Sequence, residues 1–161
     1  MAQVNARHGR RYPGRMDATR LRAIFLASGA ADDREAFLAA LPAEWDAARR
    51  ALSLAKVEYE AERYPQAQAA LGEAPRDAAG CYVAARCAVV AKAFREAVRL
   101  FEQAWEELER DPAQRLLEGV EPLPLVHDHL VRPKEVAYYL GRIYEQAGRK
   151  AEALRWYGRA T

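Results

Sequence analysis

The sequence is poor in cysteine and has no long apolar run. Its two cysteines, Cys81 and Cys87, fall within one expected helix, where a six-residue spacing separates the Cα atoms by about 9 Å along the axis. A disulfide needs a separation of about 4.4–6.8 Å, so we expect two reduced core residues and an intracellular protein, in the cytoplasm or nucleus. No segment reaches the roughly 18 apolar residues of a membrane span, and the N-terminus lacks the apolar stretch of a signal peptide. We therefore expect a soluble protein without membrane contacts.

Patterns that support catalysis are also missing. The sequence has no glycine-rich phosphate loop, no CxxC pair and no serine in a nucleophile-elbow context. The triplet His127-Asp128-His129 lies in a proline-rich segment, and no further ligand follows it at zinc-like spacing. A solvated loop is the better interpretation of the triplet. We expect no catalytic residue, metal site, cofactor or small-molecule substrate, and hence no enzyme.

Basic charge is concentrated at the start of the chain. The formal net charge is +2, but four arginines and no acid precede Met16, and the rest of the chain holds 21 basic and 23 acidic residues. We expect residues 1–15 to form a disordered basic tail, and Met16 is a second candidate start. The nearly neutral remainder argues against a nucleic-acid groove, which needs clustered basic residues.

Alanine is abundant, at 35 of 161 residues, and favours close-packed helices within one domain over residues 16–161. Apolar residues recur at helical spacing throughout, so we expect an all-α fold with no strand pairing. Caps and breakers predict helices at 17–29, 32–42, 43–63, from 64, at 77–91, 94–110, 133–147 and 150–160. Asp17 is the expected N-cap of the first helix, and Asp32 or Asp33 that of the second. Prolines make 111–132 an irregular insertion, with one helical turn at 113–118.

The last helix pair resembles the tetratricopeptide repeat (TPR). The signature residues at the repeat's spacing are Leu140, Gly141, Tyr144, Gly148, Ala153, Tyr157 and Ala160. Two earlier repeats are less regular, since Ala67 and Ala97 are 30 residues apart and Ala97 and Ala153 are 56 apart. The resemblance implies a right-handed superhelix of antiparallel helix pairs, with small residues where paired helices touch.

A narrower resemblance is to the N-terminal region of the TPR scaffold subunits of the anaphase-promoting complex, of the cell-division-cycle-sixteen type. Its motifs are Met16-Asp17-Ala18-Thr19-Arg20-Leu21-Arg22, Leu54-Ala55, Gln68-Ala69-Ala70-Leu71, Tyr82-Val83-Ala84-Ala85-Arg86-Cys87, Ala91-Lys92 and Leu140-Gly141-Arg142-Ile143-Tyr144. This resemblance implies a homodimerising, non-catalytic scaffold that joins other subunits of a ubiquitin ligase in cell division and mitosis. Another TPR protein remains open as the alternative.

The TPR resemblance also implies which residues line the concave groove. These are Arg49, Leu52, Lys56, Tyr59, Ala79, Tyr82, Arg86, Val89, Glu135, Tyr138, Arg142 and Glu145. Tyrosines combined with arginines and lysine suit a helix or an extended protein segment. For any one tyrosine, packing against neighbouring helices remains an equal alternative.

The first helix carries the large apolar residues Leu21, Ile24, Phe25 and Leu26, more than we expect a short terminal helix to cover on its own chain. We therefore expect a homodimer in which this helix docks in the partner's groove, at Lys56, Tyr59, Tyr82, Arg86, Tyr138 and Arg142. The alternative is a monomeric peptide-binding adaptor or co-chaperone.

Overall fold

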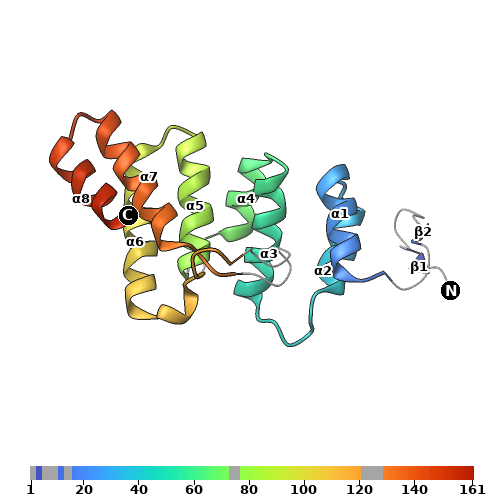
Figure 1. The fold of residues 1–161 in the computed structure, drawn as a ribbon. Helices are drawn as coiled ribbons and strands as arrows, with labels where there is room; N and C mark the ends of the chain where they lie inside the picture. Colours follow the sequence, from blue (N-terminus) through green and yellow to red (C-terminus); the bar gives the residue numbers. More distant parts are fainter. Residues whose placement is uncertain (1–2, 5–10, 13–15, 73–76, 121–128) are drawn as a thin grey trace.

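The structure is a computed structural model that describes residues 3–4, 11–12, 16–72, 77–120 and 129–161. Within these ranges eight α-helices follow one another in contacting pairs: α1 (Ala18–Ser28) with α2 (Ala31–Ala40), α3 (Ala47–Glu60) with α4 (Tyr64–Leu71), α5 (Ala78–Val90) with α6 (Phe94–Arg110), and α7 (Pro133–Gln146) with α8 (Lys150–Ala160). The pairs stand side by side in a row, from α1 and α2 at one end to α7 and α8 at the other (Figure 1). The expected all-α character is confirmed.

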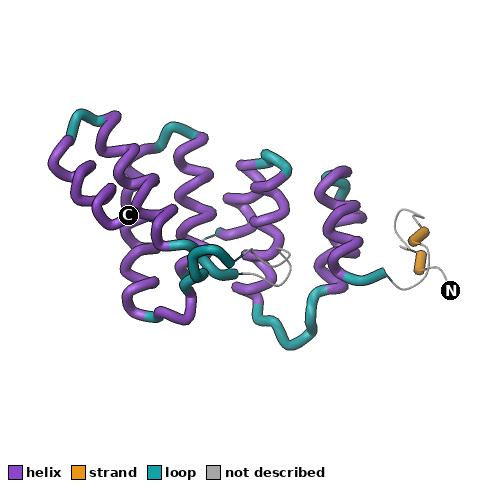
Figure 2. Tube along the Cα trace, viewed as in Figure 1, coloured by secondary structure: helices purple, strands orange, loops and turns teal. Residues whose placement is uncertain are grey.

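Strand pairing occurs in two short places, so the expectation of none is wrong in detail. Strands β1 (Gln3–Val4) and β2 (Arg11–Tyr12) pair antiparallel (Figure 2). Arg115 forms an isolated parallel bridge with Val131. Backbone N–H and C=O groups outside helices still need hydrogen-bond partners, and short bridges supply them. The rest of the expected 1–15 tail lies outside the described residues.

Aspartate side chains begin three of the helices, two of them, Asp17 and Asp77, as the sequence predicts. The carboxylate oxygens of Asp17, Asp46 and Asp77 each accept a hydrogen bond from the backbone N–H three residues later, at 2.8–2.9 Å. Gly29 ends α1 in the left-handed conformation, with φ at 63°. The expected start of the third helix at residue 43 is too early, because Asp46 is the capping residue and α3 begins at Ala47.

The second helix starts differently from the prediction. We expected Asp32 or Asp33 to be its N-cap, but α2 begins at Ala31 and has no side-chain cap. The reason is that Asp33 is fully buried and its carboxylate accepts a hydrogen bond from the hydroxyl of Ser28. The acid therefore joins α1 to α2 instead of capping the helix.

The core consists of two clusters that share α3. Leu52 and Ala55 of α3 belong to the larger cluster, which continues to α7 and against which Trp156 of α8 packs, whereas Val57 joins Phe25 and other residues of α1 and α2. Helix α3 is therefore buried on two sides. Cys81 and Cys87 are buried in the larger cluster and form no disulfide, as expected of small core residues.

Small residues lie where paired helices touch, as the repeat pattern predicts. Ala153 is buried, and a Cβ at Gly141 would lie 2.6 Å from ring atoms of Tyr157. Ala67, Ala97 and other small core residues are fully buried in the preceding pairs. The close approach of these paired helices therefore requires small residues at the contact positions.

The insertion is held to the helices at both ends. Its regular structure is the 3₁₀ turn η1 (Pro112–Gln114), shorter than the turn expected at 113–118. The side-chain oxygen of Gln114 accepts a hydrogen bond from Ala78 N at 2.8 Å, and Leu116 N donates to Val131 O at 2.8 Å. Residues 121–128 lie outside the described residues, so the conformation of the insertion's middle stays untested.

Candidate functional site

Arg86 on α5 lies among tyrosines from three different helices. Its guanidinium carbon is 5.4 Å from the ring centroid of Tyr59 on α3, 5.7 Å from that of Tyr82 on α5, and 4.3 Å from that of Tyr139 on α7. A cation over aromatic faces is attracted by their negative charge. One arginine thus links the first helices of three successive pairs.

A hydrogen-bonded chain runs through the same residues. Arg86 Nη1 donates to the hydroxyl oxygen of Tyr82 at 2.8 Å, and that hydroxyl donates to Glu135 Oε2 at 3.0 Å. Burial raises the pKa of Tyr82 far above its ordinary value, although Arg86 opposes the shift, so this hydroxyl stays protonated. Burial likewise raises the pKa of Tyr59. We call Tyr59, Tyr82, Arg86, Glu135 and Tyr139 the Arg86 cluster.

The Arg86 cluster rests on the hydrophobic core. The rings of Tyr139 and Phe101 on α6 are stacked, with centroids 5.4 Å apart and planes 2° apart, and Tyr82 meets Phe101 edge-on at 6.0 Å. Aromatic contacts of this kind fix ring positions as well as adding stability. The cluster is therefore held in position by Phe101 of α6 and by the three helices that carry its residues.

A second, more exposed group lies next to it on α7. Tyr138 is 45% exposed, its ring is 5.9 Å from that of Tyr139, and its hydroxyl accepts a hydrogen bond from Arg142 Nη1 at 3.0 Å. The ring of Tyr157 on α8 is 6.2 Å from that of Tyr138. We call Tyr138, Arg142 and Tyr157 the Tyr138 patch. The patch lies beside the Arg86 cluster, since the rings of Tyr138 and Tyr139 meet edge to face.

The structure divides the sequence-predicted site residues into two sets. It brings Tyr59, Tyr82 and Arg86 together and places Tyr138 and Arg142 beside them. Lys56 is only 9% exposed and belongs to the buried residues of α3, so its side chain adds little open surface.

The apolar residues of the first helix lie elsewhere. Leu21 is 7% exposed and Phe25 fully buried, in a cluster with Phe37 and Val57, and Leu26 packs against the same cluster. The expectation that the chain leaves this face uncovered is therefore wrong, because α2 and α3 supply the apolar cover. Ile24 is partly buried, and its place in an interface stays a prediction.

Sequence reasoning missed Tyr139, whose ring is closest to Arg86. The pair Tyr138-Tyr139 was a usable signal, because two adjacent helical residues point about 100° apart and both can border one face. The repeat pattern selected Tyr138 alone. It could not show that Tyr139 would meet both Phe101 and Arg86.

Some kinds of site can be addressed only for the described residues. They contain no group of three or more His, Cys, Asp or Glu side chains placed to hold a metal ion. Of the triplet singled out in the sequence, His127 and Asp128 are outside the described residues, and the ring of His129 lies 5.4 Å from that of Trp45. Across the described ranges, no helix combines the length and the apolar character needed to cross a membrane.

Comparison of the chain with protein-family models gives no match, and comparison with curated proteins gives no significant match. The resemblance to TPR proteins and to subunits of the anaphase-promoting complex therefore rests on the motifs in the sequence.

Proposed function

We propose that this protein is a non-catalytic scaffold of TPR-type helix pairs that binds a segment of another protein across the face of α3, α5 and α7. The observation that carries the proposal is the Arg86 cluster, in which each of these three helices contributes a tyrosine to one arginine. It gives the stacked pairs one continuous polar and aromatic face.

The composition of this face suits protein recognition. Tyrosine and arginine are the residue types most enriched in the energetically dominant parts of protein interfaces. In the Tyr138 patch, Arg142 is exposed and donates through one nitrogen to Tyr138, so its remaining N–H groups can meet carbonyl or carboxylate oxygens. The Arg86 cluster beneath it is hydrogen-bonded and packed, so the face is formed before a partner arrives.

The structure favours a monomeric adaptor over a dimer built on the first helix. Leu21 and Phe25 already pack on α2 and α3 of their own chain. Docking them in a second copy requires α1 to leave that cluster. Its departure exposes the apolar residues of α2 and α3 that it covered, and this exposure costs free energy. The face of α3, α5 and α7 is then free for a different protein, such as the client of a co-chaperone.

A homodimeric scaffold of the anaphase-promoting-complex type is the second candidate. The order of the sequence motifs and the position of the insertion favour it. Such a dimer implies assembly with other subunits of a ubiquitin ligase in the nucleus, and it needs either exchange of α1 between copies or a different contact surface. The mass of the protein in solution separates the two candidates.

The binding face can be tested without a known partner. Peptides are selected from a random displayed library for binding to the wild-type chain, and their affinity is measured for Tyr138→Ala, Arg142→Gln and the control Arg34→Gln. Arg34 is an exposed residue on α2, remote from the face. We expect the first two variants to weaken binding about tenfold and the control to leave it unchanged. Equal binding to all variants would contradict the proposal.

A further inference from the structure

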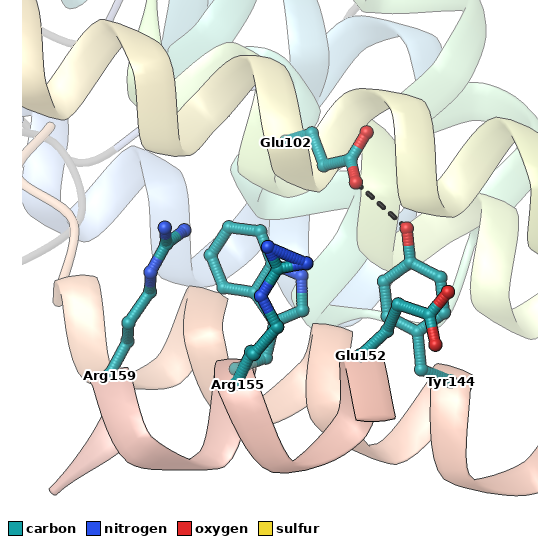
Figure 3. Close-up of a pocket in the computed structure, with 6 residues that line it drawn as sticks. Glu102, Tyr144, Glu152, Arg155 and Arg159 are labelled. Carbon is teal, nitrogen blue, oxygen red and sulfur yellow. Dashed lines mark hydrogen bonds between the residues drawn. The ribbon is translucent and has the colours of Figure 1, made fainter. Parts of the chain in front are cut away.

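A pocket of about 200 Å³ lies between α6 and α8. Figure 3 shows its lining, with Glu102 from α6, Tyr144 from α7 and four residues of α8. The α8 residues are Glu152, Arg155, Trp156 and Arg159. Sites for drug-sized ligands enclose about 300–1,000 Å³, so this volume suits one side chain of a partner better than a cofactor.

Trp156 of α8 lines this pocket and packs against Trp105 of α6. The rings of Trp156 on α8 and Trp105 on α6 meet edge-to-face, with centroids 5.4 Å apart. Trp105 Nε1 donates to Glu109 Oε1 at 2.9 Å, which fixes the orientation of its ring. The pair joins α6 to α8 and gives the pocket an apolar floor that can bury part of a bound residue.

The acidic residues of the pocket already have donors within the chain. Glu102 Oε1 accepts a hydrogen bond from the Tyr144 hydroxyl at 2.8 Å (Figure 3). Glu152 Oε1 accepts from Arg149 Nε at 2.9 Å, and its pKa is lowered by a hydrogen bond from its own backbone N–H and by Arg149. Both carboxylates are therefore held in place by the protein itself.

The arginines of the pocket are in the opposite situation. Arg159 lies over the rings of Trp156 and Trp105, at 4.5 and 5.5 Å from their centroids, and both Arg155 and Arg159 are exposed. Among the described residues neither guanidinium donates a hydrogen bond, although the charge of Arg155 contributes to the lowered pKa of Glu152. A guanidinium has five N–H donors in a planar fork that matches a carboxylate. The pocket therefore has unused donors beside an aromatic floor.

We infer that this pocket is a second docking site, which takes a carboxylate-bearing residue of a partner protein and an apolar neighbour of that residue. Arg155 and Arg159 donate to the carboxylate, and the apolar neighbour packs on Trp156 and Trp105. Charge complementarity selects an acidic segment, because the donors left open are cationic and the pocket's own acids already have partners.

This site is independent of the face proposed above. It is formed by α6, α8 and one residue of α7, whereas the Arg86 cluster is formed by α3, α5 and α7. Failure of one proposal leaves the other unchanged, and the two sites together give the scaffold two places at which to hold partners.

The tryptophans allow a direct test, because Trp156 lines the pocket, Trp105 packs against Trp156, and Trp45 packs near His129 instead. Indole N–H signals are followed by two-dimensional NMR while a capped peptide of alternating glutamate and leucine is added. We expect the signals of Trp105 and Trp156 to shift and that of Trp45 to stay in place. The matching glutamine and leucine peptide should produce no shift. Shifts with the glutamine peptide, or at all three tryptophans equally, would overturn the proposal.

Variants locate the binding. Arg155→Gln should weaken binding of the glutamate peptide about tenfold, as expected for loss of a charge-assisted hydrogen bond. Arg34→Gln removes an equal charge from α2 and should leave binding unchanged. A peptide with a free C-terminal carboxylate and no acidic side chain distinguishes the two sources of the group: its binding in place of the glutamate peptide assigns the site to chain termini. Unchanged affinity in Arg155→Gln, or binding of neither peptide, would refute the site.

Discussion

At the scale of single residues, Gly141 sets the distance between α7 and α8. A Cβ at this position would lie 2.6 Å from two ring atoms of Tyr157, closer than real contacts allow. We predict that Gly141→Ala destabilises the protein by about 1–3 kcal/mol, as overpacking does, because the ring must move and its hydrogen bond to Glu145 is lost. Urea unfolding measures the effect.

The matched control for this prediction is Gly158 on α8. A Cβ there meets nothing within 4 Å, and the position is helical. Gly158→Ala should be neutral or should stabilise the protein by up to about 1 kcal/mol, because alanine loses less backbone entropy in a helix. Equal destabilisation by the two substitutions would mean that the contact between Gly141 and Tyr157 is absent.

Tyr82 makes the stability depend on pH in the alkaline range. Its pKa is raised from the ordinary 10.0 by burial, so above about pH 10 the unfolded chain loses this proton while the folded chain keeps it. The unfolded state then binds fewer protons, and the free energy of unfolding falls as the pH rises. We predict that this decline begins near pH 10 and continues as the pH rises further, and that it is shallower in Tyr82→Phe. Identical slopes in urea titrations of the two proteins would contradict the assignment.

At the scale of elements, Arg63 fastens α1 to α3. Its Nη1 and Nη2 donate to the carbonyl oxygens of Leu26 and Phe25, at 3.1 and 3.3 Å, and its Nε donates to buried Glu58. Its guanidinium also lies 5.2 Å from the centroid of the Phe25 ring. One side chain thus satisfies the last carbonyls of α1 and a buried carboxylate.

Loss of Arg63 should weaken the attachment of α1 to α3. We predict that Arg63→Gln costs about 3 kcal/mol, because a carboxylate that is only 5% exposed loses its partner. Amide hydrogen exchange in α1 should quicken more than in α5. The control is Arg99→Gln, which breaks an exposed pair with Glu96 and should cost at most about 1 kcal/mol. Equal costs would show that α1 is held by its apolar contacts alone.

The sequence predicted the elements better than their contacts. Periodicity and caps located α6, α8 and the start of α5 because those signals are local. The capping role expected for Asp32 or Asp33 failed because the side chain of Asp33 has a partner on α1, a contact that local sequence does not encode. The same limit applies to Arg63, whose partners on α1 are 37 and 38 residues away.

In the candidate site, too, recurring local positions were predicted correctly and burial by other elements was not. The repeat pattern identified Tyr59, Tyr82 and Arg86, since each occupies a position that recurs from pair to pair. The apolar content of the first helix gave a wrong expectation for Leu21 and Phe25, because whether an apolar helix face is covered depends on how α2 folds back on it. Burial by another element is a tertiary property, and composition alone could not show it.

At the scale of the whole molecule, the burial of α1 changes how self-association should be tested. The variant that suggests itself from sequence, Ile24→Glu with Phe25→Glu, is unsuitable because Phe25 is fully buried in its own chain. A charge there destabilises the monomer whatever its oligomeric state. Ile24→Glu alone is the better probe, and we predict that it leaves both helix content and mass unchanged.

The central claim is that the chain covers its own first helix and leaves the face of α3, α5 and α7 free for another protein. The most direct test is the molar mass of the wild-type protein, measured by light scattering during size exclusion at micromolar concentration. We predict 18.1 kDa, the mass of one chain. A mass of about twice that value which returns to one chain in Ile24→Glu would contradict it and favour the homodimeric scaffold.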